Sequence, residues 1–239
     1  MMHNNEDLQF NILALDSSGE TVSAALSAKS ASWYIEITAG QSHSELLLEC
    51  ACKLFETAGL TPADLDLVSC MKGPGSFTGL RIGFSTAKGI ALALGVPLVS
   101  VPTLDCIAHR FSMWPGLVLP AIDAKKGCFF AAFYRHGKRL TDYQDSSPET
   151  LAKETARLIG CPDEPILLTG DGAELLYSPY LSFFSGGNIK VDPVCRRGSA
   201  KELLEILKNA NFNGLNDING GPLYLRKSDA ELNFKVDGL

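Results

Sequence analysis

The stretch from residue 65 to residue 102 constrains the fold of this chain more than any other. It reads LDLVSCMKGPGSFTGLRIGFSTAKGIALALGVPLVSVP, and it opens with an apolar run of strand length before a Gly/Pro turn at 73–76. The pattern predicts a helix over Phe77–Leu94, ended by Gly95, and a second short strand at Leu98–Val101. Strand, helix and strand in this order predict a βαβ unit and therefore a parallel strand pair.

Small residues recur every four positions along the predicted helix, at Gly79, Gly83, Ala87 and Ala91. This spacing places them on one helix face. Each interior glycine costs about 1 kcal/mol of helix stability relative to alanine, so the stripe indicates close approach of another backbone. That backbone belongs either to the sheet of the same chain or to a partner's helix, and the sequence leaves both open.

The element order β, β, β, α, β, α is predicted twice along the chain. Asp16 closes the first strand of the first copy and Asp123 closes the first strand of the second. The turn-forming sequence MWPG at 113–116 separates the copies, which predicts subdomains at 1–113 and 114–239. The second copy is expected to place its third strand at Arg139–Tyr143. A duplicated βββαβα unit predicts the actin-like, ribonuclease H-like α/β fold.

Proteins of this class clamp ATP between two lobes, with acids at the ends of the first strands facing a metal. The loops here differ from working phosphate loops, because Asp16 precedes Ser-Ser-Gly and Asp123 precedes Ala-Lys-Lys-Gly, whereas glycine usually follows the acid. We therefore expect at most a vestigial nucleotide site, with the candidates Asp16, Ser17, Asp123, Lys125, Gly170 and Gly172.

The sequence shows no pattern typical of a metal site or of a catalytic nucleophile. The histidines at 3, 43, 109 and 136 have no ligand spacing, and no metal site is predicted. The sequence around Ser76 does not meet G-x-S-x-G, so this serine is assigned to capping the helix, with Gly75 as the alternative cap. Seven scattered cysteines without a CxxC pair argue for reduced thiols rather than a zinc site or disulfides.

Composition excludes further classes. The formal net charge of −6 gives no general basic surface for RNA. The polar first ten residues resemble neither a signal nor a transit peptide, and the longest apolar run is too short to span a membrane. A soluble, cytoplasmic protein is expected.

The first helix, predicted from Ser42 to Ala58, contains the run Leu46-Leu47-Leu48. Three consecutive residues cover about 200° of the helix circumference. A surface helix needs only a narrower apolar stripe towards its core, so one leucine is left for a second contact surface.

At GPGSFTGLRIG, residues 73–83, the chain resembles the bacterial TsaB family, also called YeaZ. Further blocks resemble the same family in the same order, and they span nearly the whole chain: ILALDSS, HSELLL, GVPLVSVPTLD, AIDAKKGCFFAAFY and PLYLRK.

The resemblance implies a non-catalytic scaffold that pairs with TsaD as a heterodimer in forming N6-threonylcarbamoyladenosine (t6A) at adenosine 37 of tRNAs reading codons that begin with A. TsaE, an ATPase, joins the assembly, and the isolated chain is expected to form a homodimer. Contact with tRNA is implied only through the complex, and no membrane is involved. No cofactor is expected, and ATP or ADP at the partner interface stays open.

The family also implies a degenerate site and a helical interface. TsaD-type proteins carry two metal-binding histidines where this chain, aligned on GVPLVSV, has Thr103 and Ile107. In the family the first two helices pair with those of a partner. The interface residues predicted from this are His43, Leu46, Leu47, Leu48, Phe77, Gly79, Arg81, Gly83 and Ala87.

The alternative function is an actin-like small-molecule kinase or ATPase, which predicts binding of magnesium-ATP by the isolated chain and loss of that binding in Asp16→Ala. A peptidase has neither a metal site nor a triad in this sequence.

Overall fold

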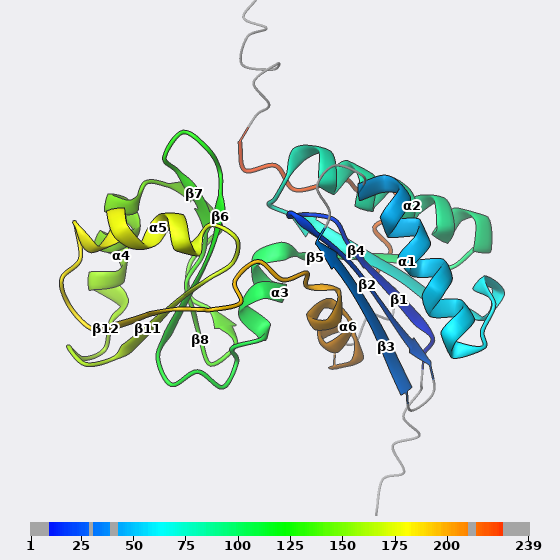
Figure 1. Ribbon diagram of the computed structural model, residues 1–239, viewed down its shortest axis with the longest axis horizontal. Coiled ribbons are helices and arrows are strands. Elements are labelled where there is room, and N and C mark those ends of the chain that lie inside the picture. Colours follow the sequence, from blue (N-terminus) through cyan, green and yellow to red (C-terminus); the bar gives the residue numbers. More distant parts are fainter. Residues whose placement is uncertain (1–9, 29–30, 39–42, 210–213, 227–239) are drawn as a thin grey trace, which may run out of the picture.

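The chain folds into two lobes that lie side by side, each built on a mixed β-sheet with helices packed on it (Figure 1). The computed structural model describes residues 10–28, 31–38, 43–209 and 214–226. This architecture is the duplicated actin-like α/β fold that the sequence predicts.

The first lobe has a sheet of strand order β3-β2-β1-β4-β5. Neighbours β3, β2 and β1 run antiparallel, whereas β1, β4 and β5 run parallel, as the βαβ prediction requires. The elements of this lobe are β1 (Ile12–Asp16), β2 (Thr21–Ala28), β3 (Ala31–Thr38), α1 (His43–Ala58), a short 3-10 helix (Pro62–Asp64), β4 (Leu67–Gly73), α2 (Phe77–Leu94) and β5 (Leu98–Pro102).

The second lobe repeats this order in space, with the sheet path β10-β7-β6-β11-β12. Its first three strands on this path are antiparallel neighbours and its last three are parallel. Its elements are β6 (Leu117–Asp123), β7 (Phe129–Ala131), β8 (Tyr134–Arg135), β9 (Lys138–Arg139), β10 (Gln144–Ser146), α4 (Pro148–Leu158), β11 (Pro165–Thr169), α5 (Ala173–Leu181) and β12 (Asn188–Val191). The predicted structural repeat is therefore confirmed.

The prediction of the third strand of the second copy at 139–143 is wrong. That strand is β10, and its residues Gln144 to Ser146 pair with β7. The small hairpin β8–β9 is inserted before it, with β8 paired to β6. The insertion takes up residues that a simple meander would have used, so the third strand begins later in the chain.

Local signals in the βαβ unit act as the sequence predicts. The Ser76 hydroxyl accepts a hydrogen bond from the Gly79 amide at 3.3 Å, which satisfies one of the free donors at the start of α2. Gly95 ends the helix with φ 69°, a left-handed conformation that glycine adopts without steric cost.

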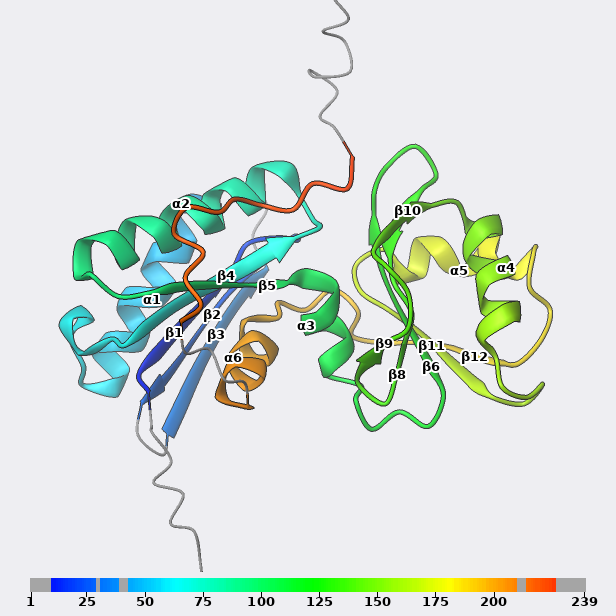
Figure 2. The ribbon, with the colours of Figure 1, turned by 180° about the vertical axis from the view of Figure 1, so that it is seen from behind.

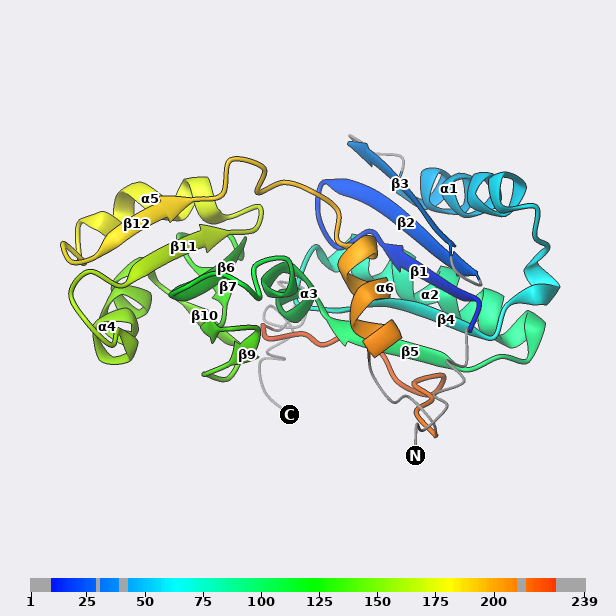
Figure 3. The same ribbon diagram turned by 90° about the horizontal axis from the view of Figure 1, so that it is seen from below.

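Two helices lie between the lobes, α3 (Thr103–His109) and α6 (Ala200–Asn209) (Figures 1 and 3). Leu104 and Ile107 of α3 pack against β6 of the second lobe. The buried leucines of α6, Leu203 and Leu207 among them, pack on the first sheet, on the face opposite α1 and α2. The described residues 200–209 and 214–222 thus lie on the first lobe, and the second sheet begins with β6 at Leu117.

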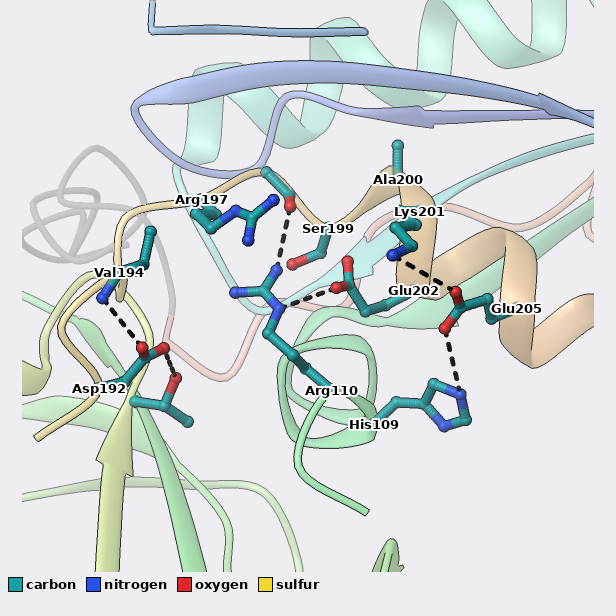
Figure 4. A network of polar contacts seen from close by, with 12 residues as sticks. His109, Arg110, Asp192, Val194, Arg197, Ser199, Ala200, Lys201, Glu202 and Glu205 are labelled. Carbon is teal, nitrogen blue, oxygen red and sulfur yellow. Dashed lines mark hydrogen bonds and ion pairs between the residues drawn. The ribbon is translucent and has the colours of Figure 1, made fainter. Parts of the chain in front are cut away.

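A network of polar contacts joins α3 to α6 (Figure 4). Arg110 donates from Nε to Glu202 Oε1 at 2.8 Å and from Nη2 to the carbonyl oxygen of Gly198 at 3.2 Å. His109 lies 3.9 Å from Glu205. Because Arg110 and Glu202 are largely buried, this pair fixes the position of α6 against α3.

Within the described part of the chain, none of the helices has the length and apolar character needed to cross a membrane.

Candidate functional site

A cleft of about 680 Å³ lies between the lobes. Its walls come from both copies of the repeat: the β1–β2 turn and the start of α2 from the first lobe, and the β6–β7 turn and Asp171 from the second. The last described residues, Leu223 to Arg226, form another part of the wall.

Asp16 is buried below the β1–β2 turn, and its carboxylate accepts hydrogen bonds from groups of the same chain. Oδ1 accepts from the backbone N–H of Ser18 at 2.9 Å and from its hydroxyl at 2.6 Å, and Oδ2 accepts from the backbone N–H of Ser199 at 2.8 Å. Burial raises the pKa of Asp16, although these hydrogen bonds act in the opposite direction. The carboxylate connects the first turn to the segment that leads into α6.

Ser17 is also turned inward. Its hydroxyl donates to the carbonyl oxygen of Gly79 at 2.9 Å, inside α2. Its exposed fraction is 1%. Asp16 and Ser17, both predicted as vestigial nucleotide-site residues, therefore hold the turn on its own lobe.

Asp123 and Lys125, the candidates from the second lobe, do line the cleft. Asp123 accepts from the backbone N–H of Lys125 at 2.8 Å and from its ammonium group at 2.7 Å. Burial alone would raise the pKa of Asp123, but the hydrogen bonds and the charge of Lys125 outweigh it, so this pKa lies below its usual value. The Lys125 side chain is 80% exposed, so it is the more accessible of the two.

Gly170 and Gly172 pack against the backbone of β6. A methyl group on Gly172 would lie 2.8 Å from the Asp123 nitrogen, so the turn that carries Asp123 rests on this glycine. Between the two glycines, Asp171 lines the cleft, and its buried Oδ1 has no hydrogen-bond partner among the residues that the structure describes. Burial, with the nearby charges of Glu20 and Asp123, raises the pKa of Asp171 to about 6.

The cleft therefore gathers charged side chains from both lobes. Among the described residues no group of three or more His, Cys, Asp or Glu side chains could hold a metal ion. Thr103 and Ile107, at the positions where the resemblance implies histidines in TsaD, are both buried residues of α3. A threonine hydroxyl is a poor substitute for an imidazole ligand, and isoleucine has no donor atom.

The three consecutive leucines of α1 face in different directions. Leu47 is fully buried in the core of the first lobe and Leu46 is partly buried against it. Leu48 is 51% exposed, so it is the most accessible of the three leucines. His43 begins α1, but its side chain lies outside the described part of the structure.

The small residues of α2 pack inward. A methyl group on Gly79 would overlap the carbonyl oxygen of Ser17, and one on Gly83 would lie 2.9 Å from the Ser17 hydroxyl. Ala87 is fully buried in the core of the same lobe. The backbone that approaches the stripe in this structure is therefore the chain's own β1–β2 turn.

Two of the predicted interface residues on α2 are exposed, Phe77 and Arg81. The Arg81 guanidinium lies 3.8 Å from the centre of the Phe77 ring. Arg81 also donates from Nε to the Tyr224 hydroxyl at 3.2 Å, and the Phe77 and Tyr224 rings lie 5.1 Å apart. Leu48, Phe77 and Arg81 remain as the accessible members of the predicted interface.

Reasoning from individual residues missed two features of the cleft. Asp171 stands between two of the predicted glycines, just after β11, and β11 lies beside β6, the strand that ends at Asp123. An acid at the end of a strand next to the one that ends in Asp123 was the available signal. The second feature is the PLYLR segment at 222–226, which lines the cleft. In the sequence it stands out only as one of the blocks that resemble the family, and no contact was predicted for its tyrosine or arginine.

Comparisons with known proteins bear on identity. The family model for TsaD, described as tRNA N6-adenosine threonylcarbamoyltransferase, matches residues 36–192. The tRNA threonylcarbamoyladenosine biosynthesis protein TsaB of Bacillus subtilis is 28% identical over 69% of this chain and 72% of its own length. TsaB of Escherichia coli is 34% identical over 52% of this chain and 54% of its own length, so that match spans about half of each protein.

The solved structure of YeaZ from Pseudomonas aeruginosa shares the fold, with a TM-score of 0.74 and 24% identity over 90% of this chain and 100% of that chain. The duplicated sheets and the cleft between them define a two-lobed protein of the actin-like class. The chain belongs to the TsaD family, and its curated relatives place it with TsaB, also named YeaZ, in the biosynthesis of threonylcarbamoyladenosine in tRNA.

Proposed function

We propose that this chain is a non-catalytic subunit that pairs with TsaD and activates transfer of the threonylcarbamoyl group to adenosine 37 of tRNAs reading codons that begin with A. The observation that carries the proposal is the state of Asp16. In a working actin-like clamp this acid would face a metal and nucleotide, but here both of its oxygens accept hydrogen bonds from Ser18 and Ser199 of the same chain.

The accessible surface of α1 and α2 supports pairing through these helices. Leu48 and Phe77 are exposed apolar side chains, 51% and 38% accessible, and Arg81 extends the surface with a charge. Exposed apolar groups of this kind mark contact surfaces when they lie together. The buried members of the predicted set, Leu47, Gly79, Gly83 and Ala87, would act indirectly by shaping the two helices.

The central test is reconstitution. Threonylcarbamoyl transfer to tRNA is measured with purified TsaD, the TsaC-type enzyme that makes the threonylcarbamoyl adenylate, and TsaE, with and without this chain. We expect transfer to depend on the chain, while the chain alone hydrolyses no ATP. Equal transfer without the chain would contradict the proposal.

The interface is tested by a pair of matched variants. Leu48→Glu places a charge on the proposed surface, whereas Phe183→Glu changes a side chain of similar exposure, 55%, in the second lobe. We expect Leu48→Glu to weaken co-elution with TsaD at least tenfold and Phe183→Glu to leave it unchanged. Equal effects of the two variants would contradict pairing through α1.

The alternative function is a small-molecule kinase or ATPase of the actin-like class. The observation that supports it is the size of the cleft, which suits a small ligand. The alternative predicts that the isolated chain binds magnesium-ATP and that Asp16→Ala abolishes this binding. Calorimetric titration of the isolated chain with magnesium-ATP separates the two functions.

A further inference from the structure

The last described residues, 222–226 (Pro-Leu-Tyr-Leu-Arg), run from one lobe to the other, and we call them the strap. In the first lobe the backbone N–H of Leu223 donates to the carbonyl oxygen of Lys72 at 2.6 Å, at the end of β4. Tyr224 adds its contacts with Phe77 and Arg81 on α2. Figure 2 shows this segment lying along α2 before it turns towards the second lobe.

The residues that lead into the strap are also fixed to the first lobe. The Asp217 backbone N–H donates to Leu98 on the open edge of β5 at 2.7 Å, and the Asp217 carboxylate accepts from the Ser100 backbone at 2.8 Å. Lys88 of α2 donates to the carbonyl oxygen of Gly220 at 2.6 Å. The first-lobe end of the strap is thus held by several independent contacts over a long segment.

Among the described residues, the polar contacts of the strap with the second lobe all come from the side chain of Arg226. Arg226 donates from Nε and Nη2 to the two carboxylate oxygens of Asp145, at 2.6 and 2.7 Å, and from Nη1 to the carbonyl oxygen of Ala124 at 2.7 Å. Asp145 lies on β10, and Ala124 lies in the turn that follows β6. One guanidinium therefore connects the strap to two elements of the second lobe.

The ion pair between Arg226 and Asp145 has bidentate geometry and is partly exposed to solvent. A bidentate arginine–carboxylate pair is among the better ion pairs, but partial exposure and salt weaken it. The Arg226 and Asp145 side chains are 25% and 20% exposed. The other connections between the lobes, through α3 and the segment before α6, lie on the opposite side of the gap from the strap (Figures 1 and 2).

We propose that the strap is a releasable clasp: it holds the two lobes closed over the cleft, and it opens at the Arg226–Asp145 end while its first-lobe end stays attached. The strap residues Leu223 to Arg226 line the cleft, so their release changes both the separation of the lobes and access to the space between them. Two lobes that are joined on one side and held on the other by a partly exposed ion pair are suited to opening and closing.

The test measures the distance between the lobes in the full chain. Cys52 of α1 and Cys161, which follows α4, are exposed cysteines in different lobes, and each takes a nitroxide label. The half-buried Cys128, whose side chain interacts with Arg226, is replaced by serine in every sample to keep a polar group beside the guanidinium. Unlabelled chain is added in excess so that distances between copies do not contribute. Pulsed electron–electron double resonance then gives the distribution of distances between the two labels.

We expect one short-distance population for the parent chain at about 0.1 M salt and a second, longer-distance population in Arg226→Ala and in Asp145→Asn. Raising the salt to about 1 M shortens the Debye length to about 3 Å, so it should populate the longer distance in the parent chain as well. The double variant Arg226→Asp with Asp145→Arg should restore the short distance.

The matched control is Arg157→Ala, which removes an arginine that pairs with Glu154 on α4, away from the strap. This variant should keep the parent distribution. Single variants that keep the parent distribution at both salt concentrations would overturn the proposal, because α3 and α6 would then set the closure alone. Opening in Arg157→Ala, or an exchanged pair that stays open, would overturn it too. Circular dichroism confirms that each variant is folded.

Discussion

The two first-strand acids, Asp16 and Asp123, occupy the same place in the two copies of the repeat and have opposite surroundings. Both accept a hydrogen bond from the backbone N–H two residues later, Ser18 in one lobe and Lys125 in the other, which is the same Asx turn. Asp16 is 3% exposed and also binds Ser199 from the far end of the chain. Asp123 faces the cleft and pairs with an exposed lysine.

The difference shows that equivalent positions in the two copies of the repeat can have different roles. In the first lobe the acid has become part of the protein interior, so its removal should affect folding. In the second lobe it remains on the surface of a cleft, so its removal should affect what the cleft can bind. Four predictions test this contrast.

The largest effect is expected for Asp16→Ala. The variant leaves buried donors of Ser18 and Ser199 without an acceptor, which should lower the free energy of unfolding by about 2–4 kcal/mol. Asp123→Ala should lower it by less than about 1 kcal/mol, because its turn is open to water. Urea denaturation at pH 7 measures both. Equal losses would show that the two turns are equivalent after all.

Asp171→Asn should have the next largest effect, in the stabilising direction. A pKa of about 6 in the folded chain, above the usual 3.8, means that Asp171 contributes stability that is complete below pH 3.8 and is lost as the pH rises through 6. At pH 7 the asparagine variant avoids burying a charge and should be more stable by about 2 kcal/mol. At pH 4 the two proteins should unfold at nearly the same urea concentration, and a gain that persists there would contradict the argument.

Gly79→Ala tests how the first turn is seated on α2. Alanine favours the helix by about 1 kcal/mol, but its methyl group overlaps the carbonyl oxygen of Ser17, and overpacking of this kind costs about 1–3 kcal/mol. We expect a net loss of about 1 kcal/mol. The control is Gly89→Ala in the same helix, where nothing lies within 4 Å of the added methyl, and it should be neutral or stabilising. Thermal unfolding of both variants decides between helix propensity and close packing.

The smallest effect is expected for Lys125→Ala. Its ammonium group pairs with Asp123 at an exposed position, so the free energy of unfolding should change by less than about 0.5 kcal/mol. The pKa of Asp123 should rise towards its usual value, because the side-chain hydrogen bond and the charge of Lys125 are lost, while the backbone N–H at position 125 still donates to Asp123. A titration followed by NMR of the Asp123 carboxyl carbon measures this shift, and an unchanged pKa would contradict the assigned cause.

Local patterns predicted the elements of the fold well. The Gly/Pro turn, the Ser76 cap and the Gly95 stop are short-range signals, and they define α2 to the residue. The duplicated order of elements predicted the fold class and the repeat in the second lobe. The inserted hairpin β8–β9 was missed because two-residue strands carry no periodicity.

Long-range partners were not predictable from patterns. Asp16 and Ser199 are far apart in the sequence, and nothing near either residue indicates the other. Glu202 follows Ser199 at the spacing of a capping box, yet its carboxylate pairs with Arg110, the residue that follows α3. A helical pattern could indicate a surplus leucine in the run 46–48, but only packing identifies Leu48 as the exposed one.

Because α6 packs on the first lobe, that lobe cannot complete its folding until the end of the chain has been synthesised. A ribosome completes β1 to α2 early, yet one face of that sheet is covered only when Leu203, Leu204 and Leu207 arrive near the end of synthesis. Until then Ile12, Ala14 and Ala25 lack their cover, and such transiently exposed apolar surface is where nascent chains bind chaperones or aggregate. The first lobe begins folding first and finishes last.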